Sequence, residues 1–169
     1  EVPVQAGGSG ASFKCKAKVA EILAGADFGF AMSVINTHNV ANNLARLTEN
    51  PAHHQKAADL IQKLLSAENI ACTALTEPAA GSDFSSITTL AKPHAQGWCI
   101  EGEKSWIINA NVADFILAYV QTQPGSGAAG IAAFLIDAKR PGFIRHTDFG
   151  SEAASSLGTS SFKLIHYIA

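Results

Sequence analysis

The chain has 169 residues, which is enough for one domain of ordinary size or for pieces of two. Hydrophobic residues make up 47% and charged residues 15%, a composition that supports a packed core and excludes an intrinsically disordered chain. With 12 basic and 14 acidic residues the net charge is −2, which argues against a general nucleic-acid binder or a protein that binds anionic membranes.

The sequence shows no membrane-spanning or targeting segment. Its longest apolar runs, such as Phe115–Val120, are far shorter than the about 20 residues that a membrane helix needs, so we expect a soluble protein without membrane insertion. It begins with Glu1 and has no basic region followed by an apolar run, so we expect a chain that starts inside a longer protein or has been processed. An odd number of cysteines without a CxxC pair predicts reduced, buried thiols and a cytoplasmic compartment; they are Cys15, Cys72 and Cys99.

The first 70 residues carry helical periodicity. A glycine-rich loop over Val2–Ser12 precedes the first predicted helix. The second runs from about Ala31 to Leu47, and the third begins at Asn50 and Pro51, a capping residue followed by the residue favoured at the first helical position. The apolar stripes of the first and third helices are Val19, Ile22, Leu23 and Ala26, and Leu60, Ile61, Leu64 and Leu65.

From Asn69 onward the apolar period changes from about 3.6 residues to about 2, which is typical of strands. Gly102, between Ile100 and Lys104, predicts a hairpin turn. Helices followed by strands indicate an α+β fold, so we predict a helical segment over residues 1–69 and an antiparallel β-domain over residues 70–169, with no parallel sheet. The predicted strands are Ile70–Leu75, Ile87–Leu90, Trp98–Glu101, Ser105–Ile108, Phe115–Gln121, Ile131–Asp137 and Phe162–Ile168.

Residues 125–130, GSGAAG, fit the GxGxxG pattern of dinucleotide-binding folds. In those folds the glycine turn opens a helix whose N-terminus faces the pyrophosphate. Here Pro124 precedes the turn and the strand-like run Ile131–Ile136 follows it, which favours a flexible hairpin loop instead. The segment Gly7–Gly10 is not a P-loop, because no Gly-Lys-Ser/Thr follows it.

No histidine cluster has the spacing of metal ligands, and we predict no metal site. His53 and His54 are adjacent, so on a helix they point about 100° apart, and a solvated helix face is their expected role. Glu77 and Asp83 lie across a Pro/Gly turn and could form a pair of carboxylates for acid–base chemistry. The alternative, which the residues favour, is turn chemistry in which Ser82 and Asp83 accept local backbone hydrogen bonds.

The segment Ala74–Asp83, with the sequence ALTEPAAGSD, is the most informative part of the chain. It closely resembles the signature that opens the middle β-domain of the acyl-CoA dehydrogenase family. A second element of that family follows at the right distance: GEKSWIIN at residues 102–109, with Ala113–Asp114 after it. The helical segments Val19–Asp27 and Leu60–Glu68 match as well, so the resemblance covers nearly the whole chain.

The resemblance implies a bound FAD. In the family the stretch Thr73–Ser82 runs along the flavin, so we expect backbone and hydroxyl groups here to bind the flavin ring and its pyrophosphate. Trp106 matches the aromatic residue packed against the isoalloxazine; the alternative is an ordinary core tryptophan. Ser82 also matches the position that contacts the thioester arm of an acyl-CoA substrate. The implied cofactor-binding residues are Thr73, Leu75, Thr76, Gly81, Ser82, Trp106 and Ile108.

Two of these residues depart from the family pattern. Ile108 stands where the family usually has Thr or Ser with its hydroxyl near flavin N5, and it offers only its backbone. Thr73 stands where an aromatic residue is often found. Both departures concern the redox tuning of the flavin and leave the expected fold unchanged.

The family is built from an N-terminal helical domain, a middle β-barrel-like domain and a C-terminal four-helix bundle. The chain resembles part of the first domain and most of the second, so we expect the four-helix bundle to be absent from it. The family's catalytic base is a Glu in that bundle, and we assign no catalytic residue to this chain. Glu77 belongs to the signature turn and is not expected to be the base.

The activity implied is a flavin-dependent acyl-CoA dehydrogenase, which converts an acyl-CoA thioester to a trans-2-enoyl-CoA with hydride transfer to FAD, as in fatty acid β-oxidation. The expected partners are the acyl-CoA substrate, an electron-transferring flavoprotein as acceptor, and further copies of the chain in a homo-oligomer, a dimer or tetramer. We expect the cytoplasm or, in a eukaryote, the mitochondrial matrix. The alternatives are an acyl-CoA oxidase or flavin monooxygenase of the same fold, and a non-catalytic truncated homologue.

Overall fold

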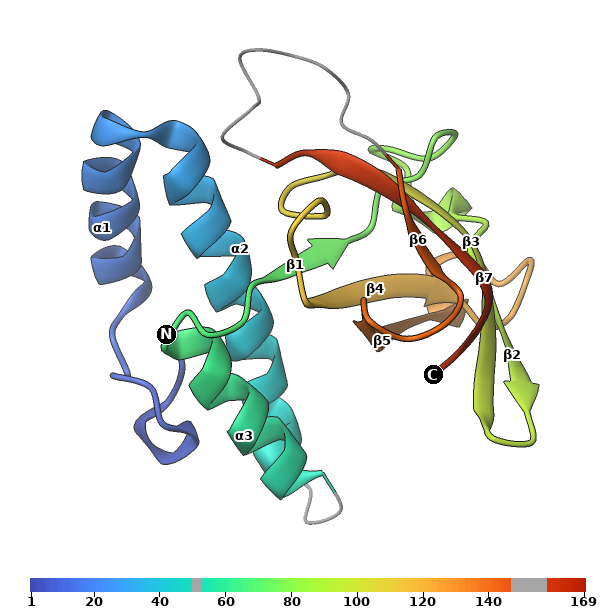
Figure 1. Ribbon diagram of the computed structural model, residues 1–169, viewed down its shortest axis with the longest axis horizontal. Coiled ribbons are helices and arrows are strands. Elements are labelled where there is room, and N and C mark those ends of the chain that lie inside the picture. Colours follow the sequence, from blue (N-terminus) through green and yellow to red (C-terminus); the bar gives the residue numbers. More distant parts are fainter. Residues whose placement is uncertain (50–52, 147–157) are drawn as a thin grey trace.

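In the computed structural model, which describes residues 1–49, 53–146 and 158–169, helices come first and a curled sheet follows (Figure 1). This order confirms the α+β fold class. The α-helices are α1 (Phe13–Ala26), α2 (Phe28–Ala45) and α3 (His54–Leu65), and 3₁₀ turns lie at Val4–Ala6, Arg46–Glu49, Phe84–Ser86 and Gly127–Gly130. The strands are β1 (Ala71–Ala74), β2 (Leu90–His94), β3 (Gly97–Ile107), β4 (Phe115–Gln121), β5 (Ile131–Asp137), β6 (Phe143–Arg145) and β7 (Ser160–Ile168).

Side-chain caps explain where the first two helices begin. The Ser12 hydroxyl accepts a hydrogen bond from a backbone N–H in the first turn of α1, at 3.2 Å. Asp27 is the single residue between α1 and α2, and its carboxylate caps α2 in the same way, at 2.8 Å. The predicted start of the third helix, Asn50–Pro51, lies outside the described residues, and the described helix begins at His54.

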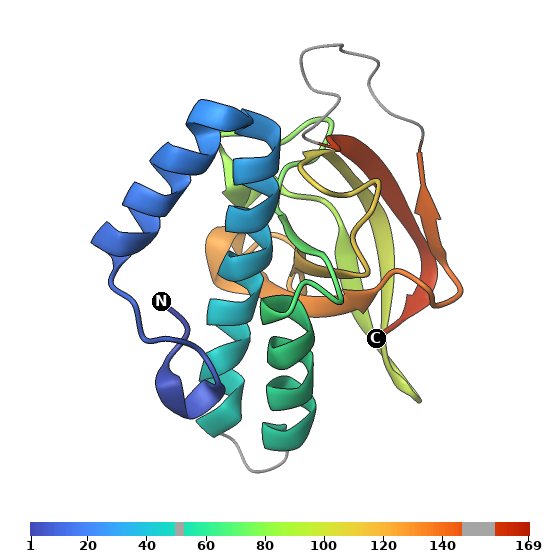
Figure 2. The same cartoon turned by 60° about the vertical axis from the view of Figure 1, so that its left-hand side comes forward.

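Two helices, α2 and α3, lie side by side against one end of the sheet (Figure 2). Their facing apolar side chains form a core with the first residue of β1 and with β4. Helix α1 packs against α2 and has no buried residue of its own. The members of this helix–sheet core include Val40, Leu44, Leu60, Ile61, Leu64, Ala71 and Leu117.

The sheet is mixed, so the prediction of a sheet without parallel strands is wrong. Its seven strands follow the order β1-β4-β2-β3-β7-β6, and β5 pairs with β4. Strand β1 runs parallel to β4, β2 meets β4 in parallel at Leu90 and Gln121, and the other pairs are antiparallel. The apolar period of a strand identifies its buried face but not its neighbour, and β1 and β4 are separated in sequence by β2 and β3.

Gly102 is not the hairpin turn that its position predicts. Strand β3 runs through it and joins the predicted strands Trp98–Glu101 and Ser105–Ile108 into one, while the turn before β3 follows His94. Gly102 has a φ of 150°, and a Cβ there would lie 2.5 Å from Thr89 Oγ1. Glycine is therefore needed because β3 passes very close to the chain that leads into β2.

The other strand predictions differ in their accuracy. Strands β4 and β5 have the predicted bounds, and they form an antiparallel hairpin, which confirms the loop interpretation of residues 125–130. The predicted strand Ile87–Leu90 is observed further along, as Leu90–His94. The short β6, Phe143–Arg145, was not predicted.

The sheet encloses a second core. Its largest fully buried side chains include Ile100, Ile116, Ile136, Phe162 and Tyr167. None of the helices among the described residues is long and apolar enough to span a membrane.

The three cysteines are free thiols, as predicted, but only one of them is buried. Cys72 lies in the sheet core, and burial raises the pKa of its thiol to about 12, which makes it unreactive. Cys15 is exposed and Cys99 is half-buried, so the prediction that all three are buried is wrong.

Candidate functional site

The signature segment leaves β1 and forms a tight turn. The Glu77 N–H donates to the Ala80 carbonyl at 2.9 Å, and the Ala80 N–H donates back to the Glu77 carbonyl at 3.2 Å. Pro78 follows Glu77, where its fixed φ favours a turn. Gly81 and Ser82 come next, and both are exposed.

Asp83 takes part in turn chemistry, as favoured from the residues. Its carboxylate caps the 3₁₀ turn Phe84–Ser86 and accepts hydrogen bonds from the Ser85 N–H at 3.2 Å and the Ser85 hydroxyl at 2.5 Å. The bond from the Ser85 hydroxyl lowers the pKa of this exposed carboxyl group. Asp83 is therefore engaged within its own turn and does not form an acid–base pair with Glu77.

A buried ion pair between Glu77 and Lys104 organises the turn. The exposed fractions of the two side chains are 3% and 0%. Lys104 Nζ donates to Glu77 Oε1 at 2.8 Å and to the Leu75 carbonyl at 3.0 Å. Glu77 also accepts hydrogen bonds from the Thr88 N–H at 2.7 Å, the Thr88 hydroxyl at 2.8 Å and the Thr89 N–H at 3.0 Å. These bonds join the end of β1 to β3 and to the chain that leads into β2.

The hydrogen bonds keep Glu77 ionised. Burial would raise its pKa, but the bonds from Lys104, Thr89 and Thr88 outweigh burial and lower the pKa to about 2. Burial lowers the pKa of Lys104, and the adjacent Glu77 carboxylate opposes that shift. A carboxylate with so low a pKa is a poor proton acceptor near neutral pH, so Glu77 is a structural anchor and not a suitable general base.

Lys104, Thr88 and Thr89 have structural roles that the motifs do not indicate. The spacing of residues in β3 could have indicated the role of Lys104. Side chains four residues apart in a strand share a face, so Lys104 lies on the same face as Ile100, and both are 0% exposed. A lysine at an inward-facing strand position needs a buried acid as its partner. The pattern does not reveal which acid, since Glu77 lies outside the strand.

Strand β3 ends in a bulge that carries Trp106. Its pairing with β7 shifts register between Lys104 and Ile107. Trp106 has a φ of 59°, a left-handed conformation that a bulky residue rarely adopts, and 62% of its surface is exposed. Within the described residues Trp106 is therefore not a core side chain. Strained backbone of this kind clusters at ligand sites.

The two family motifs meet through a backbone hydrogen bond. The Ser105 N–H donates to the Thr76 carbonyl at 3.1 Å, so Thr76 lies beside the residue that precedes Trp106. Leu75 is held to the same strand, because its carbonyl accepts the hydrogen bond from Lys104. The structure thus brings the backbone of Leu75 and Thr76, just after β1, next to the end of β3 that carries Trp106.

The remaining predicted residues lie around this contact. Thr73 is half-buried in β1, opposite Leu117 of β4, and Ile108 is half-buried just after β3. Ser82 and Gly81 lie in the exposed turn. A Cβ placed on Gly81 would meet no described atom within 4 Å, so the packing of the described chain does not require glycine there.

Asn109 and Thr37 attach this region to the helices. Asn109 is buried, and its side-chain amide donates to the Ser33 carbonyl of α2 at 3.1 Å and to the Ala71 carbonyl of β1 at 3.3 Å. The Thr37 hydroxyl of α2 also donates to the Ala71 carbonyl, at 3.1 Å. Helix α2 is thereby held against the start of β1, next to the second motif.

Known proteins resemble the chain in both sequence and structure. The short/branched chain specific acyl-CoA dehydrogenase of Rattus norvegicus, a mitochondrial protein, is 35% identical over 159 residues, which cover 92% of this chain and 36% of that protein. The L-prolyl-[peptidyl-carrier protein] dehydrogenase of Pseudomonas fluorescens is 43% identical over 79 residues, 46% of this chain and 21% of that protein. A solved structure, the FAD complex of PigA, superimposes with a TM-score of 0.85 at 27% identity, over 99% of this chain and 43% of that one.

The chain therefore spans less than half the length of these relatives. The family model for the acyl-CoA dehydrogenase middle domain matches residues 72–164, which include both motifs of the site. Since this match covers more than half of the chain and agrees with the likeness to the rat enzyme, the chain belongs to the acyl-CoA dehydrogenase family.

Proposed function

We propose that the whole protein is an FAD-dependent acyl-CoA dehydrogenase and that residues 1–169 supply the flavin-facing wall of its site. The observation that carries this proposal is the contact between the two motifs. The Ser105–Thr76 backbone hydrogen bond holds a hydroxyl-bearing residue beside the strained, exposed Trp106. Family members whose solved structures resemble this one, such as PigA, are described as FAD complexes.

The residues around this contact fit a flavin. Trp106 presents an aromatic face that suits stacking on the isoalloxazine ring. Gly81 leaves open space at an exposed turn, where the main chain can approach a pyrophosphate closely. Hydroxyl and backbone groups supply hydrogen bonds. The residues proposed to bind the cofactor are Thr73, Leu75, Thr76, Gly81, Ser82, Trp106 and Ile108.

When bound, FAD supplies the hydride acceptor for oxidation of an acyl-CoA thioester to a trans-2-enoyl-CoA. The residues of this chain bind and orient the reactants: Trp106 and Thr76 position the ring, and Ser82 orients the thioester arm. Glu77 does not remove the α-proton, because Lys104 and the two threonines stabilise its ionised form. We propose that the base lies outside these 169 residues, in the family's C-terminal four-helix bundle.

The organisation and partners follow from the same proposal. Residues 1–69 form part of the N-terminal helical domain and residues 70–169 form the middle β-domain. We propose an electron-transferring flavoprotein as the electron acceptor and a homo-oligomeric full-length enzyme. The compartment is the cytoplasm, or the mitochondrial matrix if the source is eukaryotic.

A second candidate substrate is a prolyl group carried by a peptidyl carrier protein. It is favoured by one observation, the 43% identity to the prolyl-carrier dehydrogenase of Pseudomonas fluorescens over 79 residues. The reaction would again be oxidation of a thioester-bound acyl group, so the flavin-facing residues keep the same roles.

Anaerobic reduction of the flavin tests both candidates. The full-length protein is mixed without oxygen with a panel of straight and branched acyl-CoAs and, separately, with a prolyl-loaded carrier protein. We expect the flavin absorbance to bleach with one class of substrate. In air, release of hydrogen peroxide or of a hydroxylated product without an added acceptor would instead identify an oxidase or a monooxygenase. If the protein retains FAD but none of these substrates bleaches the flavin, the result would favour the non-catalytic homologue and overturn the proposal.

A further inference from the structure

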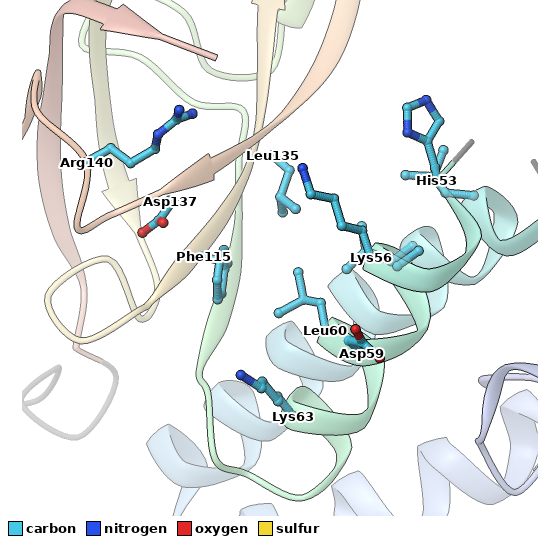
Figure 3. A pocket seen from close by; sticks show the side chains of 12 residues that line it. His53, Lys56, Asp59, Leu60, Lys63, Phe115, Leu135, Asp137 and Arg140 are labelled. Atoms are coloured by element: carbon cyan, nitrogen blue, oxygen red, sulfur yellow. The ribbon is translucent and has the colours of Figure 1, made fainter. Parts of the chain in front are cut away.

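A groove separates α3 from the β4–β5 hairpin, away from the residues of the candidate flavin site. We call it the α3–β5 groove. Its volume is about 560 Å³, which lies in the range of small-molecule pockets. Figure 3 shows its apolar floor, with Leu60 of α3 facing Phe115 of β4 and Leu135 of β5. None of the residues proposed to bind FAD lines it.

Cationic side chains surround the apolar floor. Lys56 and Lys63 are two turns apart on α3, and Arg140 lies after β5 on the opposite wall. Figure 3 shows that the Lys56 side chain extends from α3 across the groove towards Leu135. Among the described residues no carboxylate lies within ion-pair distance of Lys56, whereas Lys63 has only a long pair with Glu68, at 3.7 Å.

The two acids that line the groove already accept other hydrogen bonds. Asp59 accepts a bond from the Gln55 side chain at 2.7 Å. Asp137 accepts one from the Lys139 N–H at 2.9 Å. Two of the three cations are engaged as well, because Lys63 pairs with Glu68 and the Arg140 guanidinium donates to the Ile168 carbonyl at 3.1 Å. Among the described residues that line the groove, Lys56 is therefore the cation left for a ligand. Lys56 is exposed, and Figure 3 shows its side chain beside the apolar floor, so a chain bound on that floor would bring an anionic head group within reach of the ammonium.

We propose that the α3–β5 groove binds a single-chain amphiphile with an anionic head group, a carboxylate or a phosphate. The chain covers Leu60, Phe115 and Leu135, and the head group pairs with Lys56. Burial of apolar surface supplies most of the affinity, and the charge pair selects the sign of the head group. This site is separate from the candidate flavin site, so the proposal does not rest on the dehydrogenase function.

The test is calorimetric titration of the full 169-residue chain with decanoate and with decyl phosphate, each below its micelle concentration. Decyltrimethylammonium has the same chain with a cationic head, and acetate has the head group without the chain. We expect saturable binding of one anionic amphiphile per chain and none of the two comparison compounds. Saturable binding of either decanoate or decyl phosphate supports the proposal. The one that binds with the higher affinity identifies the preferred head group.

Two variants locate the ligand. Lys56→Gln removes the charge at an exposed position and is expected to weaken binding about tenfold. Leu135→Asp places an anion on the floor and is expected to weaken it by more than about tenfold. Lys14→Gln makes the same charge change as Lys56→Gln on α1, outside the groove, and is expected to change affinity less than about twofold. Circular dichroism checks that each variant stays folded.

The proposal is overturned if no saturable binding occurs, or if the cationic amphiphile binds as well as decanoate. It is also overturned if Lys56→Gln and Leu135→Asp bind the anion as tightly as Lys14→Gln does, since the ligand would then lie elsewhere. Each of these results is independent of whether the protein binds FAD.

Discussion

Trp106 combines a left-handed backbone, an exposed indole and a place beside Thr76. In the full-length protein, Trp106→Ala is expected to weaken FAD binding by about 1–3 kcal/mol, because the flavin loses an aromatic face. Thr76→Ala is expected to weaken it by about 1 kcal/mol through a lost hydrogen bond. Titration with FAD, followed by flavin absorbance, measures both effects.

Phe13→Ala is the control for these two variants, because Phe13 is 71% exposed on α1 and has no expected role in the flavin site. It should leave FAD affinity unchanged. If Trp106→Ala leaves both the affinity and the flavin spectrum unchanged, the proposed position of the flavin ring is wrong.

Gly81 and Gly102 are expected to respond to alanine in opposite ways. The Cβ that Gly81→Ala adds would meet no described atom within 4 Å, so the free energy of unfolding should change by less than about 1 kcal/mol. FAD affinity should nevertheless fall about tenfold, because the added methyl group occupies space that a pyrophosphate needs. Gly102→Ala would bring a Cβ within 2.5 Å of Thr89 Oγ1, and it should lower the stability of the protein instead.

Urea unfolding and FAD titration of the same two variants separate these effects. A loss of stability in Gly81→Ala would mean that the turn packs more tightly than described. An unchanged FAD affinity in that variant would remove the main argument for placing the pyrophosphate at this turn.

The bonds of Glu77 and Lys104 connect three elements that are distant in sequence, and their loss should affect all of them. Breaking a buried ion pair leaves an uncompensated charge, so Lys104→Met or Glu77→Gln is expected to lower the free energy of unfolding by about 3–5 kcal/mol. The double variant should lose less than the sum of the two, because neither charge is left alone.

Urea denaturation measures these losses, and the exposed pair Lys18–Glu21 is the matched control. Its ions lie 2.9 Å apart on α1, and Lys18→Met should cost less than about 1 kcal/mol. Equal losses at the two pairs would contradict the structural role given to Glu77.

The low pKa of Glu77 also predicts how stability depends on pH. Its carboxyl has a pKa of about 2 in the folded protein against its usual value of 4.5. The folded state binds this proton less readily than the unfolded chain does, so the stabilisation is complete above about pH 4.5 and is lost as the pH falls towards 2. The full contribution is about 3 kcal/mol.

Comparison of wild-type protein with Glu77→Gln isolates this contribution, since the glutamine does not titrate. The difference in the free energy of unfolding should be largest above about pH 4.5 and shrink steadily in more acidic solution. A difference that stays constant down to pH 2 would show that the carboxyl has an ordinary pKa.

The helical part of the molecule exposes several large apolar side chains. Exposed aromatic and aliphatic side chains on α1 and at the start of α2 include Phe13, Ile22, Phe28 and Phe30. Exposed apolar side chains in this number favour association. For the isolated 169-residue chain we therefore expect self-association and weak retention of FAD, even with the flavin-facing residues in place.

The isolated chain is also expected not to oxidise acyl-CoA substrates. Proton abstraction needs a base within about 3 Å of the proton, or one water away, and Glu77 is held in its ion pair. Anaerobic mixing of the purified chain with FAD and acyl-CoAs, followed by flavin absorbance, checks this. Bleaching at a rate comparable to that of the full-length protein would show that a base lies within residues 1–169.

The sequence by itself predicted the features that depend only on residues close together in the chain. Strands β4 and β5 were predicted at their observed bounds, because each is a compact apolar run delimited by turn residues. The loop between them was distinguished from a dinucleotide site by the strand that follows it. The two motifs identified the family, and the family model confirms that assignment over residues 72–164.

Contacts between distant segments were decided by the tertiary structure. Neither the parallel pairing of β1 with β4 nor the passage of β3 beside Thr89 follows from the apolar period of any one strand. The left-handed backbone and the exposure of Trp106 depend on the register shift between β3 and β7. The role of Lys104 depends on its contact with Glu77, which lies outside β3. Periodicity records which face of a segment is buried, whereas partners, register and desolvated charge pairs arise only when the segments pack together.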